Sequence, residues 1–150
     1  MLGEVNSAYL NFEKSYIDYF LLKNLDPYTN QLGGNKASLM ELKNRLRNQI
    51  TQKELLEQEY KLKQKDFERE KTLFEKGVIS QKEYELKQLE ILQMKKNVSA
   101  MAISISQITE AISTANQNLK KTRINEQEDN TRYASSLSQS YDLLKEAIRK

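Results

Sequence analysis

The side chains that carry out most enzyme chemistry are missing from this chain. Its 150 residues contain no histidine and no cysteine, which excludes a hydrolytic triad, a His general base, a His-ligated metal and a thiolate nucleophile. The carboxylates Glu126, Glu128 and Asp129 lie in one short stretch, but their spacing is not that of a calcium-binding loop. We therefore expect no enzymatic activity, no bound metal and no cofactor.

The composition favours long, exposed helices over a globular core. Charged residues make up 30% of the chain and hydrophobic residues 38%, with only 4 Gly and 1 Pro. Such a profile is typical of helices that bury one narrow apolar stripe. The 24 basic and 21 acidic residues are interspersed, so no concentrated basic patch predicts nucleic-acid binding. No run of residues approaches the ~20 apolar positions that a membrane-spanning helix needs.

Two hydrophobic stripes, each with residues three and four positions apart, mirror one another about residues 77–80. The first stripe comprises Leu39, Leu42, Leu46, Gln49, Lys53, Leu56, Tyr60, Lys63, Phe67, Glu70 and Phe74, and the second Tyr84, Lys87, Ile91, Met94, Val98, Met101, Ile105, Ile108, Ile112, Ala115 and Leu119. An antiparallel coiled coil requires this symmetry, because knobs must face holes at equal distances from the turn. Phe74 is thus expected to meet Tyr84, and Glu70 to form a register-fixing ion pair with Lys87.

These patterns predict an all-α fold, a long antiparallel coiled-coil hairpin. Its first arm is expected to be split into helices over about 4–25 and 38–76, and its second arm to be one helix over about 81–149. Asp26 precedes Pro27, which disfavours helix and ends the first element. The glycine-containing segment 27–36 is expected to be a linker. Ser38, with Glu41 three residues on, is expected to cap the second helix.

The turn at residues 77–80, here called the tip, has several local signals of its own. Gly77 occupies the position where a left-handed residue ends a helix. Ser80 and Glu83 have the spacing of a capping box, and Ile79 and Tyr84 that of a hydrophobic staple. The sequence therefore predicts a closed turn that starts the last helix at about residue 81.

The residues around the tip resemble those of a known family. Arg69, Leu73 and Ser80 have the spacing found at the end of the α-hairpin in HlyD-type periplasmic adaptor proteins, also called membrane fusion proteins. The stretches LFEKGVIS and QKEYEL are similar to that family as well. By motif the resemblance covers about residues 69–86, and by architecture the whole chain. The split first arm is similar to the haemolysin-secretion branch, whereas the family's lipoyl-like and β-barrel sequences are not present in these residues.

The resemblance implies a role in a tripartite system for type I secretion or efflux. The whole of 1–150 would be one elongated hairpin domain of a larger periplasmic adaptor, anchored in the inner membrane through segments outside this chain. Its partners would be an inner-membrane transporter, neighbouring adaptors in a ring, expected to be a hexamer, and a TolC-like outer-membrane channel. The residues expected to dock on that channel are Arg69, Leu73, Gly77, Val78, Ile79 and Ser80.

Simpler explanations exist for four of these residues. Capping accounts for Ser80, and backbone geometry accounts for Gly77. Arg69 fits either a surface ion pair with a nearby acidic residue or a fork that binds carbonyls of another protein. Leu73 fits either a contact that closes the tip or an exposed anchor. For the whole chain, the alternative is a cytoplasmic coiled-coil scaffold or dimerisation rod.

Overall fold

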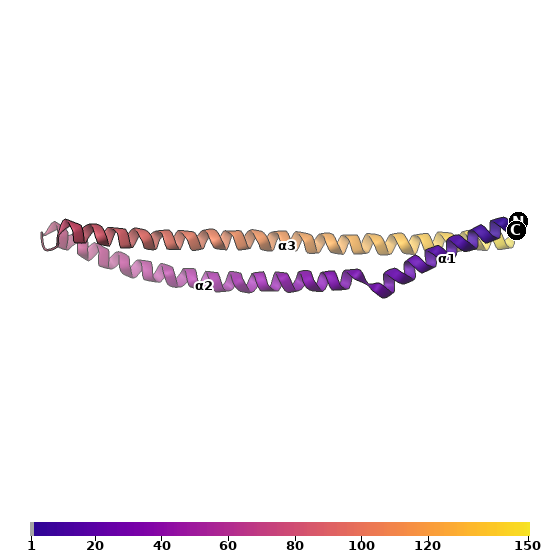
Figure 1. Ribbon diagram of the computed structural model, residues 1–150, viewed down its shortest axis with the longest axis horizontal. Coiled ribbons are helices and arrows are strands. Elements are labelled where there is room, and N and C mark those ends of the chain that lie inside the picture. Colours follow the sequence, from indigo (N-terminus) through magenta and orange to yellow (C-terminus); the bar gives the residue numbers. More distant parts are fainter. Residues whose placement is uncertain (1) are drawn as a thin grey trace. The chain divides into compact units, whose positions relative to one another are not determined.

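The computed structural model describes residues 2–150, which form three helices (Figure 1). These are α1 (Leu2–Leu25), α2 (Pro27–Glu75) and α3 (Gln81–Arg149). No strand occurs within 2–150. The all-α hairpin is confirmed, with a first arm in two pieces and a second arm that is one helix. None of the three helices combines the length and the apolar character that crossing a bilayer requires.

The chain divides into two compact units. Residues 39–114 form one unit, which contains most of α2, the tip and the first part of α3. The other unit consists of the described residues up to 38 together with residues 115–150, and so contains α1, the beginning of α2 and the last part of α3. The tip belongs entirely to the first of these units.

The mirrored stripes form the core of the unit at 39–114. Every predicted stripe residue in this unit is buried or half-buried except Lys63 and Lys87, and Leu39 and Ile108 are the most enclosed. A polar contact also joins the two helices within the seam, where the Ser104 hydroxyl donates to Gln49 Oε1 at 2.6 Å. The seam is narrow, because only one stripe of each helix is covered.

The expected linker at 27–36 is wrong, since α2 already begins at Pro27. The interruption is confined to Asp26, whose φ of 40° lies in the left-handed region. Pro27 is suited to the first helical position, where its missing N–H would have no partner and its fixed φ is already helical. The Thr29 hydroxyl donates to Asp26 Oδ2 at 2.6 Å and ties this first turn to the break.

Ser38 is consequently not an N-cap, as it lies in the interior of α2. The helix continues through Gly33 and Gly34, neither of which has a positive φ. Two glycines in a helix interior cost about 1 kcal/mol each relative to alanine. This cost is too small to end the helix. Because the break is at Asp26, α2 begins at Pro27 and not at about residue 38.

In the other unit, α1 packs beside the last part of α3 through aromatic side chains. The ring centroids of Phe12 and Tyr141 are 5.9 Å apart, and Phe12 also contacts Tyr16 at 6.3 Å. No described residue of α1 is fully buried. Two small polar residues of α3, Thr122 and Ser140, are buried instead, and their hydroxyls donate to carbonyls of their own helix.

Candidate docking tip

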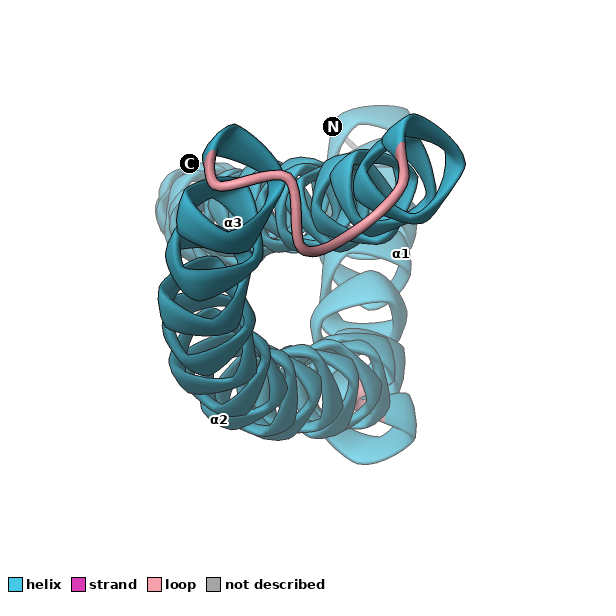
Figure 2. Cartoon of the chain, turned by 90° about the vertical axis from the view of Figure 1, so that its left-hand side faces the viewer, coloured by secondary structure: helices cyan, strands magenta, loops and turns pink. Residues whose placement is uncertain are grey.

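Backbone hydrogen bonds close the tip at the end of α2 (Figure 2, where the loop is pink). The Val78 N–H donates to the Leu73 carbonyl at 2.8 Å, and the Gly77 N–H donates to the Phe74 carbonyl at 3.0 Å. Together with a φ of 73° at Gly77, these bonds form a Schellman motif. The expected left-handed conformation of Gly77 is confirmed.

Ser80 begins α3 with a complete capping box. Its hydroxyl accepts a hydrogen bond from the Glu83 N–H at 3.2 Å, and the Glu83 carboxylate accepts one from the Ser80 N–H, also at 3.2 Å. Both contacts satisfy backbone N–H groups that a helix start would otherwise leave to water. The capping role predicted for Ser80 is therefore confirmed.

Stacked aromatic rings join the two helices next to the turn. The Phe74 and Tyr84 centroids are 4.5 Å apart with an interplanar angle of 6°, as the mirrored stripes predicted. Phe67, two turns earlier in α2, lies 5.5 Å from the same Tyr84 ring. Tyr84 thus contacts two aromatic residues of α2 and helps to fix the register of α3 against α2.

Four of the predicted docking side chains, among them that of Ser80, are accessible on this closed scaffold. Arg69 exposes 79% of its side chain, Val78 is 66% exposed, and Leu73 is also exposed, whereas Ile79 is half-buried. Arg69 Nη1 lies 3.5 Å from Asp66 Oδ1. A solvent-exposed pair of this kind contributes at most about 1 kcal/mol, and a guanidinium has five N–H donors. Arg69 can therefore donate to a partner while it keeps this contact.

The predicted ion pair between Glu70 and Lys87 is absent from the ion pairs formed within 2–150. Lys87 Nζ instead lies 3.8 Å from Glu90 Oε2, one turn along its own helix. A lysine on an exposed face reaches a carboxylate three residues away without crossing the seam. The register is held instead by the stack of Phe74 on Tyr84 and by the bond from Ser104 to Gln49.

The chain matches no family model, no curated protein and no solved structure. The assignment of a function therefore depends on the residues of this chain and on their geometry.

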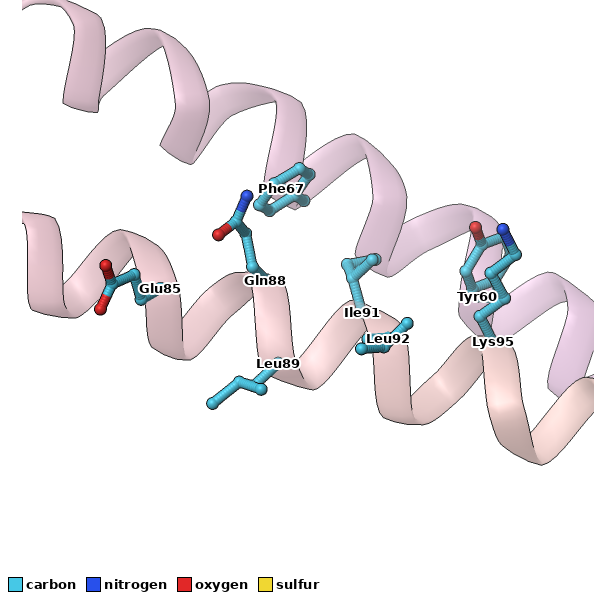
Figure 3. A pocket seen from close by; sticks show the side chains of 8 residues that line it. All are labelled: Tyr60, Phe67, Glu85, Gln88, Leu89, Ile91, Leu92 and Lys95. Atoms are coloured by element: carbon cyan, nitrogen blue, oxygen red, sulfur yellow. The ribbon is translucent and has the colours of Figure 1, made fainter.

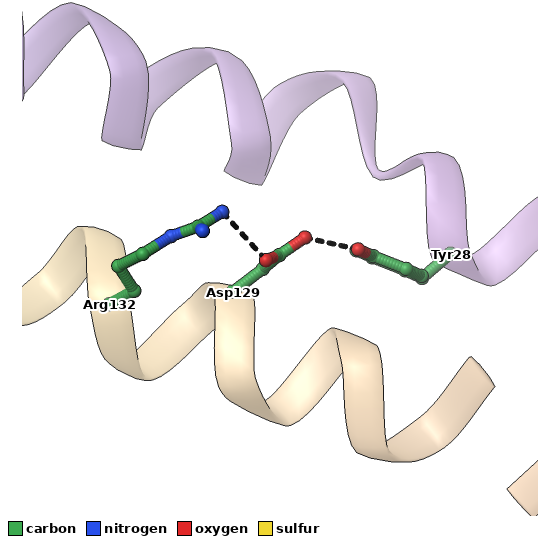
Figure 4. Close-up of polar contacts among 3 residues, drawn as sticks. All are labelled: Tyr28, Asp129 and Arg132. Atoms are coloured by element: carbon green, nitrogen blue, oxygen red, sulfur yellow. Dashed lines mark hydrogen bonds and ion pairs between the residues drawn. The ribbon is translucent and has the colours of Figure 1, made fainter. Parts of the chain in front are cut away.

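A polar cluster that the sequence reasoning missed lies in the other unit (Figure 4). The Tyr28 hydroxyl donates to Asp129 Oδ2, and Arg132 Nη2 donates to Asp129 Oδ1 at 2.9 Å. The hydrogen bond to Asp129 raises the pKa of Tyr28, with smaller contributions from desolvation and from the negative charge of Asp129. Tyr28 and Asp129 are at nearly equal distances from the tip along the chain. Extending the mirrored pairing of the stripes to these positions would have placed the two residues opposite each other.

The acidic residues 126, 128 and 129 do not gather into a site for a cation. Within the described part of the chain, no group of three or more His, Cys, Asp or Glu side chains is arranged to hold a metal ion. Asp129 is instead engaged by Tyr28 and Arg132. The tip remains the place where a preformed backbone and accessible side chains coincide.

Proposed function

We propose that this chain is the α-hairpin of a periplasmic adaptor subunit in a tripartite type I secretion or efflux system. Its tip docks on a TolC-like outer-membrane channel, and it catalyses no reaction itself. The observation that carries this proposal is a turn fixed by its own hydrogen bonds that leaves Arg69, Leu73 and Val78 accessible. The resemblance of residues 69–86 to adaptor tips is the second support.

The closed turn would favour docking in energetic terms. Association is opposed by the loss of conformational freedom in the segments that become ordered, and a loop that is already ordered loses little. The Schellman motif and the capping box order residues 73–83 before any partner arrives. Val78 and Leu73 would then supply apolar anchors, and Arg69 would donate to carbonyls at helix ends of the channel.

A single tip presents a small surface, so the proposed complex depends on several copies. Adaptors standing side by side in a ring, for which we propose a hexamer, would present several tips to one channel at a high effective concentration. Connection to an inner-membrane transporter would be made by parts of the adaptor outside this chain. In this arrangement the hairpin extends the path between the two membranes.

A pull-down with a matched control tests the proposal. The chain is displayed multivalently on beads and exposed to detergent-solubilised outer membranes of the source organism, and the retained proteins are identified by mass spectrometry. A second bait carries Arg69→Ala and Val78→Asp. A third bait carries Leu62→Asp on α2, since Leu62 is 64% exposed and so matches Val78 in exposure and in the charge introduced.

The expected result is that a TolC-like channel is retained by the unchanged and Leu62→Asp baits and lost from the tip variant. Retention of the same channel by all three baits would exclude the tip as the docking site. If no channel is retained by any bait, the cytoplasmic scaffold becomes the better interpretation. Ser80→Asn, which preserves a capping side chain, separates the two roles of Ser80: loss of the channel with this variant would indicate direct contact by the hydroxyl.

A further inference from the structure

An apolar groove runs along one side of the hairpin close to the tip (Figure 3). It has a volume of about 630 Å³, and Tyr60 and Phe67 of α2 line it together with Ile91 of α3. Leu89 and Leu92 of α3 also line it, and they are 61% and 48% exposed. Figure 3 shows Leu89 pointing away from α2. Two large aliphatic side chains are thus presented to solvent beside an open groove.

Charged residues bound this apolar surface at both ends. Glu85 lies at the end nearer the tip and Lys95 at the other end, and both line the groove. The Glu85 carboxylate accepts a hydrogen bond from the Gln81 amide. Lys95 takes part in none of the ion pairs found between described residues. The two ends of the groove therefore carry opposite charges.

The order of these residues along α3 is symmetric in a way that selects a partner. Glu85 and Lys95 are equally far from residue 90, and Leu89 and Leu92 lie on either side of the same region. When a second copy of α3 is laid antiparallel about residue 90, Glu85 of each copy faces Lys95 of the other, and Leu89 of each copy lies one residue out of register with Leu92 of the other. A contact of this kind is isologous, since one patch serves both copies.

We infer that the groove between Glu85 and Lys95 is a dimerisation surface, occupied by the same segment of a second copy of this chain in antiparallel orientation. The occupant is a helix whose apolar side chains enter a groove, which is a common mode of helix recognition. Charge complementarity favours this occupant, because the antiparallel pairing places opposite charges together at both ends. This inference does not rest on the proposed function, as it needs no channel and uses other residues than the docking set.

Charge-reversal variants, measured alone and mixed with each other, test whether the two copies pair with two-fold symmetry. Glu85→Lys alone places two lysines opposite each other at both ends of the contact, and Lys95→Glu alone does the same with two glutamates. Each single variant is expected to weaken self-association roughly tenfold. The double variant Glu85→Lys/Lys95→Glu restores the opposite charges, and so does an equimolar mixture of the two single variants.

The measurement is sedimentation equilibrium of the whole chain over a range of concentrations at low ionic strength, with circular dichroism to check that each variant stays helical. Concentration-dependent dimers of the unchanged chain, weakened in both single variants and recovered in the double variant and in the mixture, support the inference. A chain that remains monomeric throughout overturns it. Dimers that ignore the charge reversals, or that are not recovered by mixing, overturn it as well.

An antiparallel dimer points its two tips in opposite directions and is therefore an assembly distinct from the proposed ring, but the two experiments use different variants and give separate results. Glu85→Lys and Lys95→Glu leave Arg69, Leu73 and Val78 unchanged, and both residues that are replaced are exposed. A failure to dimerise would therefore leave the tip available for docking. Conversely, a dimer that forms in the absence of any channel would leave the identity of the tip's partner open to the separate experiment.

Discussion

The ring of Tyr84 lies almost flat on the ring of Phe74, with centroids 4.5 Å apart and an interplanar angle of 6°. The two residues come from the last turn of α2 and the first turn of α3. Their contact therefore closes the helix pair directly below the turn. It is the first layer of the seam and the layer on which the geometry of the tip depends.

Phe74→Ala should lower the free energy of unfolding by about 2–3 kcal/mol. The substitution removes a half-buried aromatic side chain and its stacking energy, so the effect is below that of a fully enclosed phenylalanine. Urea unfolding followed by circular dichroism measures it. Leu62→Ala, at an exposed position of α2, serves as a control with an expected change within about 0.5 kcal/mol. Equal losses from the two variants would contradict the stacked layer.

Alanine at two glycines should have opposite effects. Gly77→Ala places a Cβ on a residue with a φ of 73° and should cost about 1–2 kcal/mol. Gly34→Ala, in the interior of α2, should raise stability by about 0.5–1 kcal/mol. Neither Cβ would meet another atom within 4 Å, so backbone conformation alone decides the sign. Thermal unfolding of both variants checks this, and a stabilising Gly77→Ala would show that the turn is not left-handed.

Ser80→Ala should destabilise the hairpin by about 1 kcal/mol because the Glu83 N–H loses its acceptor. Ser80→Asn should retain most of the stability, since asparagine is an equally good capping residue. Chemical denaturation of the two variants side by side provides the measurement. If alanine and asparagine behave alike, the hydroxyl contributes nothing as a cap.

Tyr28→Phe should lower stability at neutral pH, and this loss should vanish in alkaline solution. The folded state holds the hydroxyl proton more tightly than the unfolded state, because the bond to Asp129 raises the pKa of Tyr28. The contribution is thus complete below the unfolded value of about 10 and is lost as the pH rises through the folded value. Urea unfolding of both proteins from pH 7 upward reveals the difference.

Asp129→Asn is the companion variant for this experiment. It removes the negative charge beside the phenol while keeping an acceptor oxygen, so the pH-dependent difference between tyrosine and phenylalanine should shrink. A difference that stays constant with pH in the unchanged background would mean that the hydroxyl does not bond to Asp129 in solution.

Local signals account for the parts of the fold that the sequence predicted. Gly77, Ser80 and Glu83 act on backbone groups within a few residues, so their spacing alone determines the turn and the start of α3. The mirrored stripes predicted the facing layers for a similar reason, since a hydrophobic seam has one register in which apolar residues meet. The stack of Phe74 on Tyr84 is the direct result.

The predictions that failed involve choices between nearly equal alternatives. Glycine content suggested a linker, but helix propensity is a weak prior of about 1 kcal/mol per glycine, and one left-handed residue at Asp26 suffices for the break. Lys87 is long and flexible, and it pairs with the exposed Glu90 on its own helix while Glu70 across the seam is half-buried. The docking role of Arg69 stays a prediction, because its energy depends on the groups of another protein.

The distance along the chain between contacting residues sets the order in which the hairpin can be made. Tyr84 follows Phe74 closely, whereas 55 positions separate Gln49 from Ser104 and 101 separate Tyr28 from Asp129. The entropy lost on closing a loop grows with its length, so pairing starts beside the turn and spreads outward. During synthesis, α1 emerges first but finds Tyr141 last. A newly made α1 therefore has only its own aromatic neighbours to contact until translation has passed Tyr141.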